Sequence, residues 1–249
     1  MRETIKHKNG EKNKKSQIGI FLIIVVIPLS IWIGTVIFPE KIYAWISLVV
    51  AILSCIPIFV HFERKETSNK ELIIIAVLIT ISTLGRFLFA WIPGFKPVTA
   101  ITVIVAVYLG KEVGFVVGSL SAVASNFYFG QGPWTPFQMF SWGFIGFLAG
   151  ALAPNLKRKK INLMIYGAFS GVLFSLIMDS WTTLWADGTF NLSRYLAVCV
   201  SAIPVTIEYM ISNIIFLQLM YKSMGDILER ITIKYGLFQE ARRSQSYYE

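Results

Sequence analysis

The stretch Asn126-Phe-Tyr-Phe-Gly-Gln-Gly-Pro-Trp-Thr-Pro-Phe-Gln-Met-Phe140 lies between two apolar runs and is the least membrane-like part of its neighbourhood. Gly130, Gly132, Pro133 and Pro136 oppose a continuous helix, so the backbone groups freed there need partners in water or in protein. This predicts a loop at a membrane surface. Its aromatic rings and three side-chain amides offer more recognition chemistry than a simple turn between two spans requires.

The composition of the whole chain is that of an integral membrane protein. Of its 249 residues, 55% are hydrophobic and 15% are charged, whereas about a quarter of the residues of soluble proteins are charged. The mean hydropathy is +0.63. The apolar residues form segments near the roughly 20 residues that cross a bilayer as a helix, and the alternation typical of barrel strands is absent. We therefore expect an all-α membrane protein.

Eight spans are expected, and they divide the chain into three regions. The spans are residues 18–38, 42–62, 71–92, 98–110, 113–130, 137–154, 162–186 and 195–221. The first two belong to residues 1–70, which comprise a basic N-terminus, a transmembrane hairpin and a cytoplasmic linker. The other six form a core over residues 71–225. Residues 226–249 are expected to be an amphipathic cytoplasmic segment and a tail, because apolar residues recur there with helical spacing among charges.

The positive charges predict the orientation of these spans. With the N-terminus inside, the cytoplasmic segments hold 19 Lys and Arg residues, and the outer loops hold Lys41, Lys96 and Arg194. The positive-inside rule therefore places both termini in the cytoplasm. It also explains the formal net charge of +9 without nucleic acid. The loops expected outside include residues 93–97, 131–136 and 187–194.

Pairs of small residues four apart predict close approach between helices. They are Gly114/Gly118, Gly146/Gly150 and Gly167/Gly171, with Ala76/Thr80 as a weaker pair. Such spacing lets two backbones touch, either within the bundle or against another protein. We expect most of these pairs to pack within the bundle.

Polar side chains inside spans are candidates for function, because they are costly in a bilayer. Four of them lie near the outer ends of their spans, namely Arg86, Asn126, Gln138 and Asp179. The other two, Glu208 and Asn213, lie nearer the midplane. The first four are placed as they would be if they lined a cavity open to the outside. The alternative is that Arg86 pairs with Asp179 or Glu208 only to neutralise buried charge.

Aromatic residues gather around the same outer loops. The tryptophans are Trp91, Trp134, Trp142, Trp181 and Trp185, and Phe95, Tyr128 and Phe129 accompany them. They form either a stacking pocket or an interfacial aromatic belt. Lys96 either meets an anionic group or is a solvated loop charge.

Several motifs of enzymes are absent from the sequence. There is no G-x-x-x-x-G-K-[ST] for ATP, no GxSxG, and no CxxC around Cys55 or Cys199. The two histidines, His7 and His61, both fall on the cytoplasmic side. We expect no enzyme, no metal and no cofactor, with an intramembrane carboxylate mechanism as the catalytic alternative.

Four motifs together resemble the substrate-binding S components of energy-coupling-factor (ECF) vitamin transporters. They are Ser82-Thr-Leu-Gly-Arg86, Pro93-x-Phe-Lys-Pro97, Gly110-Lys-Glu-x-Gly-Phe115 and Ser125-Asn-Phe-x-Phe-Gly-Gln-Gly-Pro-Trp-Thr-Pro-x-Gln-Met139. The resemblance covers roughly residues 71–225 and leaves out the N-terminal hairpin.

This resemblance implies a six-helix core that binds a vitamin-like micronutrient from outside the cell. It also implies partners, namely a membrane coupling subunit and two cytoplasmic ATPase subunits that hydrolyse ATP on its behalf. In such proteins small residues of the first core helix form the docking face. Ala76 and Thr80 match that position, with threonine where the family usually has a second alanine.

The subgroup with Gly-Gln-Gly-Pro-Trp-Thr-Pro resembles components for corrinoids and for queuosine precursors. A corrinoid needs apolar faces and amide partners, and a deazapurine needs a stacking ring with one or two carboxylates or amides. We favour a corrinoid such as cobalamin. The expected contacts are Arg86, Phe95, Lys96, Asn126, Tyr128, Gln131, Trp134, Gln138, Asp179 and Trp181. A self-sufficient secondary transporter is a further alternative, although no inverted repeat is evident.

Overall fold

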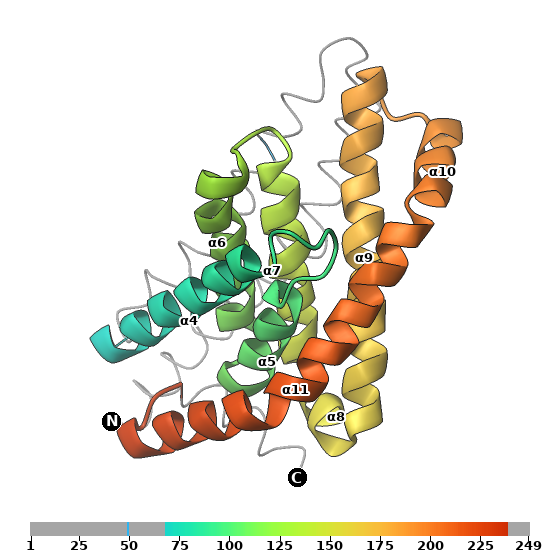
Figure 1. Cartoon of the computed structure of the whole chain (residues 1–249). Coiled ribbons are helices and arrows are strands. Elements are labelled where there is room, and N and C mark those ends of the chain that lie inside the picture. The colour runs from blue at the N-terminus through green and yellow to red at the C-terminus, as the bar shows by residue number, and fades with distance from the viewer. Residues whose placement is uncertain (1–48, 50–67, 239–249) are drawn as a thin grey trace, which may run out of the picture.

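The computed structural model describes residues 68–238, together with residue 49. Within residues 68–238 the chain forms eight helices and no strand, which confirms the predicted all-α class. The expected hairpin of spans 18–38 and 42–62, and the tail after residue 238, lie outside the described residues. The helices are α4 (Asn69–Leu88), α5 (Val98–Leu109), α6 (Lys111–Phe129), α7 (Thr135–Ala151), α8 (Ala153–Arg158), α9 (Lys160–Asp187), α10 (Leu192–Ser201) and α11 (Ile203–Tyr235) (Figure 1).

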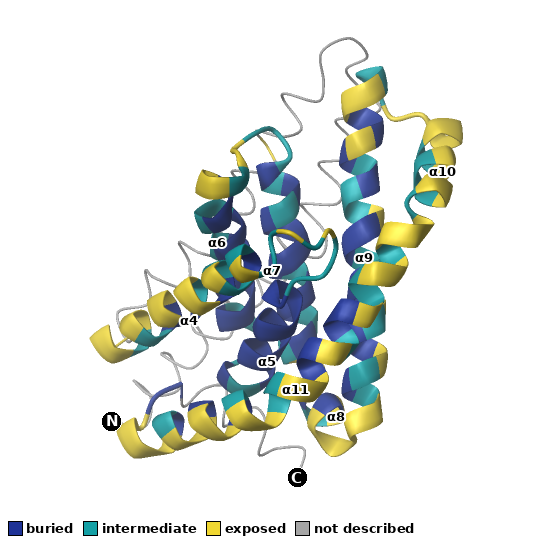
Figure 2. Ribbon diagram, in the orientation of Figure 1, coloured by how far each residue is buried: buried dark blue, intermediate teal, exposed yellow. Residues whose placement is uncertain are grey.

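Helix α5 is the centre of the bundle. Eleven of its twelve residues are buried, and it packs against α4, α6, α7 and α11 (Figure 2). A helix of this length rises only about 18 Å, which is shorter than the roughly 30 Å hydrocarbon core of a bilayer. Because its neighbours cover it, α5 does not have to span the lipid, and this explains the short fourth span in the sequence.

Glycine lets two pairs of helices approach backbone to backbone. A methyl group on Gly118 of α6 would lie 2.5 Å from the carbonyl oxygen of Trp142 on α7. A methyl group on Gly171 of α9 would lie 2.7 Å from the backbone nitrogen of Met210 on α11. No side chain fits at either place. The pairs Gly114/Gly118, Gly146/Gly150 and Gly167/Gly171 thus pack within the bundle, as predicted.

The last helices differ from the single span predicted at residues 195–221. The chain breaks at Ala202 into α10 and α11, and Pro204 lies in the first turn of α11. Proline is tolerated in a first turn, but its ring opposes a helix that continues from the preceding residues. Helix α11 then runs without interruption to Tyr235, through the amphipathic residues that follow position 225.

The C-terminal end of α11 lies against the start of α4 (Figure 1). The backbone N–H of Phe238 donates to Glu71 Oε1 at 2.6 Å, and the Lys70 ammonium lies 4.9 Å from the centre of the Tyr235 ring. The Phe238 side chain is buried. The first and last helices of the core are therefore joined at the end where the charge count predicts the cytoplasm.

Helices α4, α9 and α11 are long and apolar enough to cross a membrane. One face of α4 is exposed and apolar, with Ile73, Val77 and Leu88 between 51% and 72% exposed. Ala76 and Thr80 lie on this same exposed face. Water opposes so much exposed apolar surface and lipid accepts it, which supports a multi-pass membrane location.

Candidate functional site

Arg86 is the charged residue at the centre of the site. It lies in the last turn of α4, is 8% exposed, and reaches across to α6. Its Nη1 donates to Asn126 Oδ1 at 2.8 Å and to the hydroxyl oxygen of Ser125. Both acceptors are neutral. A buried guanidinium that is hydrogen-bonded to neutral groups keeps its positive charge inside the bundle.

Asn126 connects Arg86 to the turn between α6 and α7. Its Nδ2 donates to Gln138 Oε1 at 2.8 Å and to Thr135 Oγ1 at 2.9 Å. The Thr135 hydroxyl in turn donates to Gln131 Oε1 at 3.0 Å. Asn126 is therefore bonded to Arg86, and Gln138 is connected to Arg86 only through Asn126, so these two amides are hydrogen-bonded to one another.

The glycine and proline residues shape the turn itself. Gly130 has φ +98°, a conformation that favours glycine. The Trp134 ring packs so closely on Gly132 that a methyl group there would lie 2.3 Å from ring atoms. Gln131 Nε2 donates to the Val123 carbonyl oxygen at 2.9 Å and closes the turn onto α6. Gln131 and Trp134 thus both stabilise the turn.

Aromatic rings surround the Arg86 guanidinium and continue across the bundle. Its central carbon lies 4.6 Å from the centre of the Phe129 ring and 4.9 Å from that of Trp142. Trp142 stacks on Phe174 at 5.0 Å, and Phe174 meets Tyr209 edge to face at 5.3 Å. The rings form a row from α6 through α7 and α9 to α11, with Arg86 between the first two rings, Phe129 and Trp142.

The loop at residues 93–97 packs onto α11. The Lys96 backbone N–H donates to Ser212 Oγ at 2.9 Å, and the Ser212 hydroxyl donates to the Lys96 carbonyl oxygen at 3.2 Å. Gly94 has φ +60°, and a methyl group there would lie 2.5 Å from Glu208 Oε2. The Phe95 ring lies 4.9 Å from that of Phe216. Lys96, Phe95 and Glu208 are thereby brought to the same end of the bundle as Arg86.

Lys96 lies in this loop, outside the spans, and its charge is influenced by the site. Burial lowers the pKa of the Lys96 ammonium below its ordinary value, the charge of Arg86 lowers it further, and Glu208 acts in the opposite direction. Its Nζ donates to the Ile92 carbonyl oxygen at 3.3 Å. Charges from α4, from this loop and from α11 therefore act on one another here.

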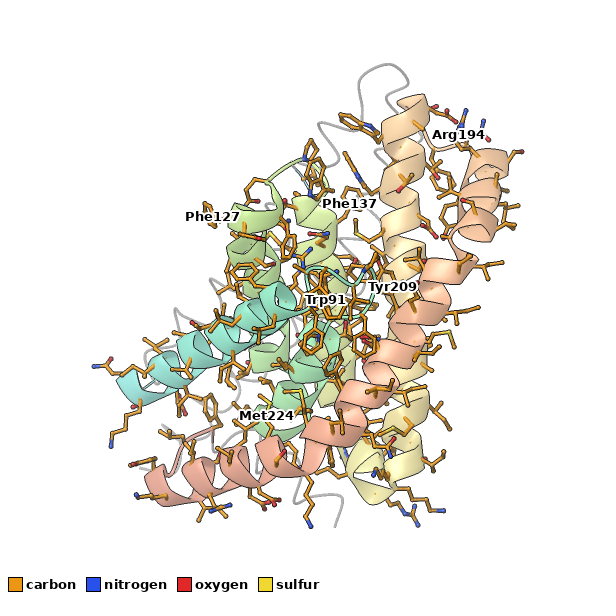
Figure 3. The ribbon with its side chains drawn as sticks, in the orientation of Figure 1. Trp91, Phe127, Phe137, Arg194, Tyr209 and Met224 are labelled. Atoms are coloured by element: carbon orange, nitrogen blue, oxygen red, sulfur yellow. The ribbon has the colours of Figure 1, made fainter. Side chains whose placement is uncertain are left out.

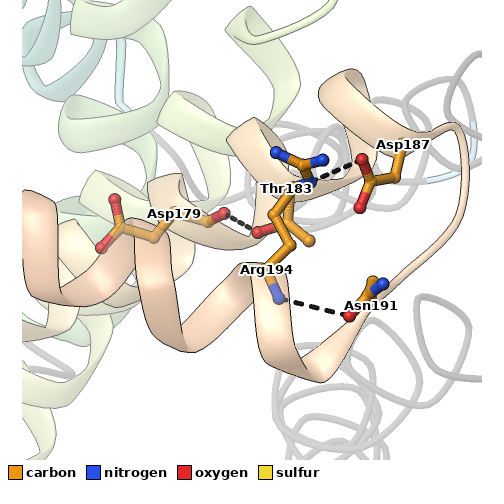
Figure 4. Close-up of polar contacts among 5 residues, drawn as sticks. All are labelled: Asp179, Thr183, Asp187, Asn191 and Arg194. Carbon is orange, nitrogen blue, oxygen red and sulfur yellow. Dashed lines mark hydrogen bonds and ion pairs between the residues drawn. The ribbon is translucent and has the colours of Figure 1, made fainter.

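Asp179 and Trp181 of α9 lie apart from the Arg86 hydrogen bonds. Asp179 Oδ2 accepts from the Ser175 hydroxyl at 3.4 Å, and its carbonyl oxygen accepts from Thr183 Oγ1 at 2.9 Å (Figure 4). Trp181 is buried against Phe137 at 5.5 Å. Among the described residues Arg86 forms no ion pair with Asp179 or Glu208, and its hydrogen bonds go to Ser125 and Asn126.

An ion pair does form at the α9–α10 turn. Arg194 Nε lies 2.5 Å from Asp187 Oδ1, and the Arg194 backbone N–H donates to Asn191 Oδ1 at 3.2 Å (Figure 4). The Arg194 side chain is 51% exposed. This pair stabilises a surface turn and is not part of the site.

The aromatic residues of the opening stretch point in different directions. Phe127 is 80% exposed and points away from the bundle, whereas Phe137 is 1% exposed and lies inside it (Figure 3). Tyr128 is 69% exposed and contacts Phe87 at 4.8 Å. Tyr128 therefore lies at the surface and reaches the site through Phe129, whose ring centre is 5.1 Å from its own.

Several residues of the site were not among those expected from the sequence. Ser125 and Thr135 complete the hydrogen bonds around Asn126, and Phe174, Tyr209 and Ser212 supply rings and an anchor from other helices. Ser125 and Thr135 had a signal, since both flank predicted residues in the same motif. Ser212 had none, because a single serine on a long helix has no local pattern.

The described helices form an apolar bundle in which a buried cation, a row of rings and hydrogen-bonded amides lie together, and such groups are typical of small-molecule sites. Residues 66–225 match the sequence model of the family described as ECF-type riboflavin transporter, S component, and the chain belongs to this family. S components are substrate-capture subunits of ECF importers, which are transporters and not enzymes, and they act with a T subunit and ATPase subunits. No curated protein and no solved structure matches the chain.

Proposed function

We propose that the chain captures a corrinoid, such as cobalamin, from outside the cell for an ATP-driven ECF importer. The observation that carries this proposal is the position of Arg86, buried between the Phe129 and Trp142 rings and bonded to the Gly-Gln-Gly-Pro-Trp-Thr-Pro turn through Asn126. Flat ring systems bind on aromatic side chains, and a few placed polar groups fix their orientation.

In this proposal the expected contact residues supply charge, aromatic rings or amide groups. Arg86, Lys96 and Asp179 supply charge, while Phe95, Tyr128, Trp134 and Trp181 supply rings. The amides of Asn126, Gln131 and Gln138 hydrogen-bond within the chain. We assign them first to positioning Arg86 and the turn, with their remaining lone pairs and N–H groups free to meet the ligand's amides.

A second ligand has an observation in its favour. The matching family model is described for a riboflavin transporter, and a flavin also presents a flat ring system to stacking side chains. A queuosine precursor, a deazapurine, is the third candidate, for which Asp179, Trp181 and Asn126 supply the carboxylate, ring and amide. These ligands share the site and differ in size and charge.

Calorimetric titration separates the three ligands. The full chain is purified in detergent, its absorbance spectrum is recorded for a co-bound chromophore, and cobalamin, riboflavin and a deazapurine are titrated into it. Binding of cobalamin well below micromolar concentration supports the proposal. Binding of riboflavin or the deazapurine alone keeps the capture function and changes the ligand, and binding of none of the three contradicts the proposal.

The proposal includes the partners and the orientation. The exposed face of α4 with Ala76 and Thr80 docks the coupling subunit, the ligand site opens to the outside, and both termini are cytoplasmic. We expect Thr80→Trp to abolish co-purification with the coupling and ATPase subunits without changing ligand affinity, because the side chain lies outside the ligand site. If Thr80→Trp loses ligand affinity as well as co-purification with the partner subunits, the docking face is not separate from the ligand site.

The self-sufficient secondary transporter is tested by uptake. Vesicles that contain this chain alone are loaded with an ion gradient, and vesicles that also contain the coupling and ATPase subunits receive internal ATP. We expect uptake in the second set alone. Ion-driven uptake by the chain alone would assign it to the other class of transporter.

A further inference from the structure

Arg86 uses only part of its guanidinium within the described residues. Nη1 makes the bonds to Ser125 and Asn126, whereas the buried Nε has no acceptor and Nη2 donates to no described residue. In a planar guanidinium, Nε–H and Nη2–H point in parallel from one edge. This is an edge that binds a carboxylate or a phosphate through two hydrogen bonds.

The surroundings of that edge leave the charge uncompensated. The described acceptors of Arg86 are neutral, and Phe129 and Trp142 contribute only ring faces. Ring faces stabilise a cation, but less than an anion does in a site without water. Asp179 is hydrogen-bonded to Ser175 on the same helix. A buried cation without an anion is costly, so the arrangement is suited to a negative charge supplied by something else.

A second cation lies near the first. Arg86 lies in the last turn of α4, Lys96 lies in the loop that follows and is bonded to Ser212 of α11, and the charge of Arg86 lowers the pKa of the Lys96 ammonium. Glu208 opposes this effect in part, but it is exposed and packs against Gly94 of the loop. Two cations at the same end of the bundle both attract an anion that binds there.

We infer that Arg86 and Lys96 form an anion subsite, and that the captured micronutrient carries a phosphate or carboxylate group on the Nε–Nη2 edge of Arg86. This inference rests on the proposed capture function and specifies the chemistry of its ligand. The negative group lies beside the Phe129 and Trp142 rings, which leaves the Phe174 and Tyr209 end of the ring row for an apolar part of the ligand.

The subsite predicts that, within each class of ligand, the member that carries a phosphate binds more tightly than the member that lacks one. Cobalamin carries a phosphodiester in its nucleotide loop and cobinamide has no phosphate. Flavin mononucleotide carries a phosphate and riboflavin has none. The phosphate-bearing member of the class that binds is expected to bind at least about tenfold more tightly, because two charge-assisted hydrogen bonds are gained. The preference should be lost in Arg86→Gln and reduced in Arg86→Lys, which keeps the charge but not the parallel pair of donors.

The experiment has a vitamin arm and a phosphate arm. In the first, cobalamin, cobinamide, flavin mononucleotide and riboflavin are titrated into the full chain and into Arg86→Gln, Lys96→Gln and Arg194→Gln. Arg194 is the matched control, since it is an arginine outside the site with its own ion pair. In the second, the melting temperature of each variant is compared in excess inorganic phosphate and in chloride at equal ionic strength.

The two arms separate failure of the subsite from failure of the proposed ligand. We expect phosphate to stabilise the wild-type chain and Arg194→Gln more than the Arg86 and Lys96 variants. Equal binding of both members of a pair by the wild-type chain, or equal stabilisation of all variants by phosphate, overturns the subsite. If no vitamin binds, the proposed ligand fails and the phosphate arm still decides the subsite. If Arg86→Gln does not fold, the same two measurements on Lys96→Gln, a substitution in the loop, decide whether the subsite exists.

Discussion

The two ends of α4 are tied to other helices by contacts of different kinds. At one end Arg86 bonds to α6 inside the bundle, and part of its guanidinium has no partner. At the other end Glu71 accepts from Ser68 in a capping box and from the backbone of Phe238, near the surface. The first end has unused binding capacity, whereas the second has its acceptors occupied.

This difference indicates which contacts serve the ligand and which serve the fold. Contacts that are complete, such as those of Glu71, stabilise the structure whether or not a ligand is present. A buried donor that is incomplete costs stability until a ligand supplies its acceptor. Substitutions at the Arg86 end should therefore change affinity and stability together, and substitutions at the Glu71 end should change stability alone.

The largest effect is expected from Asn126→Ala. It removes an acceptor from Arg86 and the bonds to Thr135 and Gln138. We expect unfolding to become easier by about 2 to 3 kcal/mol, since one lost bond involves a charged group, and ligand affinity to fall at least tenfold, by about 1.4 kcal/mol or more. Thermal unfolding in detergent and calorimetry measure both. Asn191→Ala, which removes the α10 cap, is the control and should leave affinity unchanged. Unchanged affinity in Asn126→Ala would contradict the comparison.

The next effect is expected from Ser212→Ala, which releases the loop at residues 93–97 from α11. Its hydroxyl makes two hydrogen bonds to the Lys96 backbone. We expect a loss of about 1 kcal/mol in stability and faster ligand dissociation, because Lys96 is no longer fixed beside Arg86. Stopped-flow dissociation measures this. Ser201→Ala, whose hydroxyl is exposed and bonded within its own helix, should dissociate like the wild-type chain. Equal rates for Ser212→Ala would show that the loop has no part in retention.

The sequence predicted the main features of the Arg86 end. Its composition indicated an all-α membrane protein, and Gly130, Gly132, Pro133 and Pro136 marked the turn that separates α6 from α7. Helical rise alone placed Arg86, Asn126 and Gln138 at similar depth, and these three are hydrogen-bonded in a chain. Local patterns were sufficient here because each signal lies within one segment or depends on distance along a helix.

Other features could not be predicted because they depend on contacts between distant segments. Lys96 and Ser212 are 116 positions apart, and no local pattern joins them. The partners of Asn126, Gln131 and Gln138 were equally hidden, since the same sequence allows an amide to face either a ligand or another group of the chain. The join between Phe238 and Glu71 arises because α11 continues past residue 225, and amphipathic spacing does not say where such a helix ends.

A pH dependence should distinguish the Arg86 end from the Glu71 end by a smaller effect. Because the pKa of Lys96 is lowered, this group loses its proton at a less alkaline pH than an ordinary lysine. As pH rises through that value, affinity for the phosphate-bearing ligand should fall. The unfolded chain binds the proton more tightly, so the stability of the empty chain should rise over the same range. Calorimetry and melting at several pH values measure these opposite trends, and both should disappear in Lys96→Gln. If affinity and stability change in the same direction as pH rises, Lys96 does not act as a cation that binds the phosphate of the ligand.

The smallest effect on affinity is expected from Glu71→Ala at the other end of α4. The substitution removes the capping-box bond to Ser68 and the bond to Phe238, so stability should fall by about 1 kcal/mol. Amide hydrogen exchange near residues 235–238 should accelerate, because the C-terminal end of α11 loses its attachment. Ligand affinity should not change. Glu71→Gln keeps the acceptor oxygen and should lie between Glu71→Ala and the wild-type chain. If affinity falls in Glu71→Ala as it does in Asn126→Ala, the two ends of α4 are coupled, and the separation between ligand contacts and fold contacts does not hold.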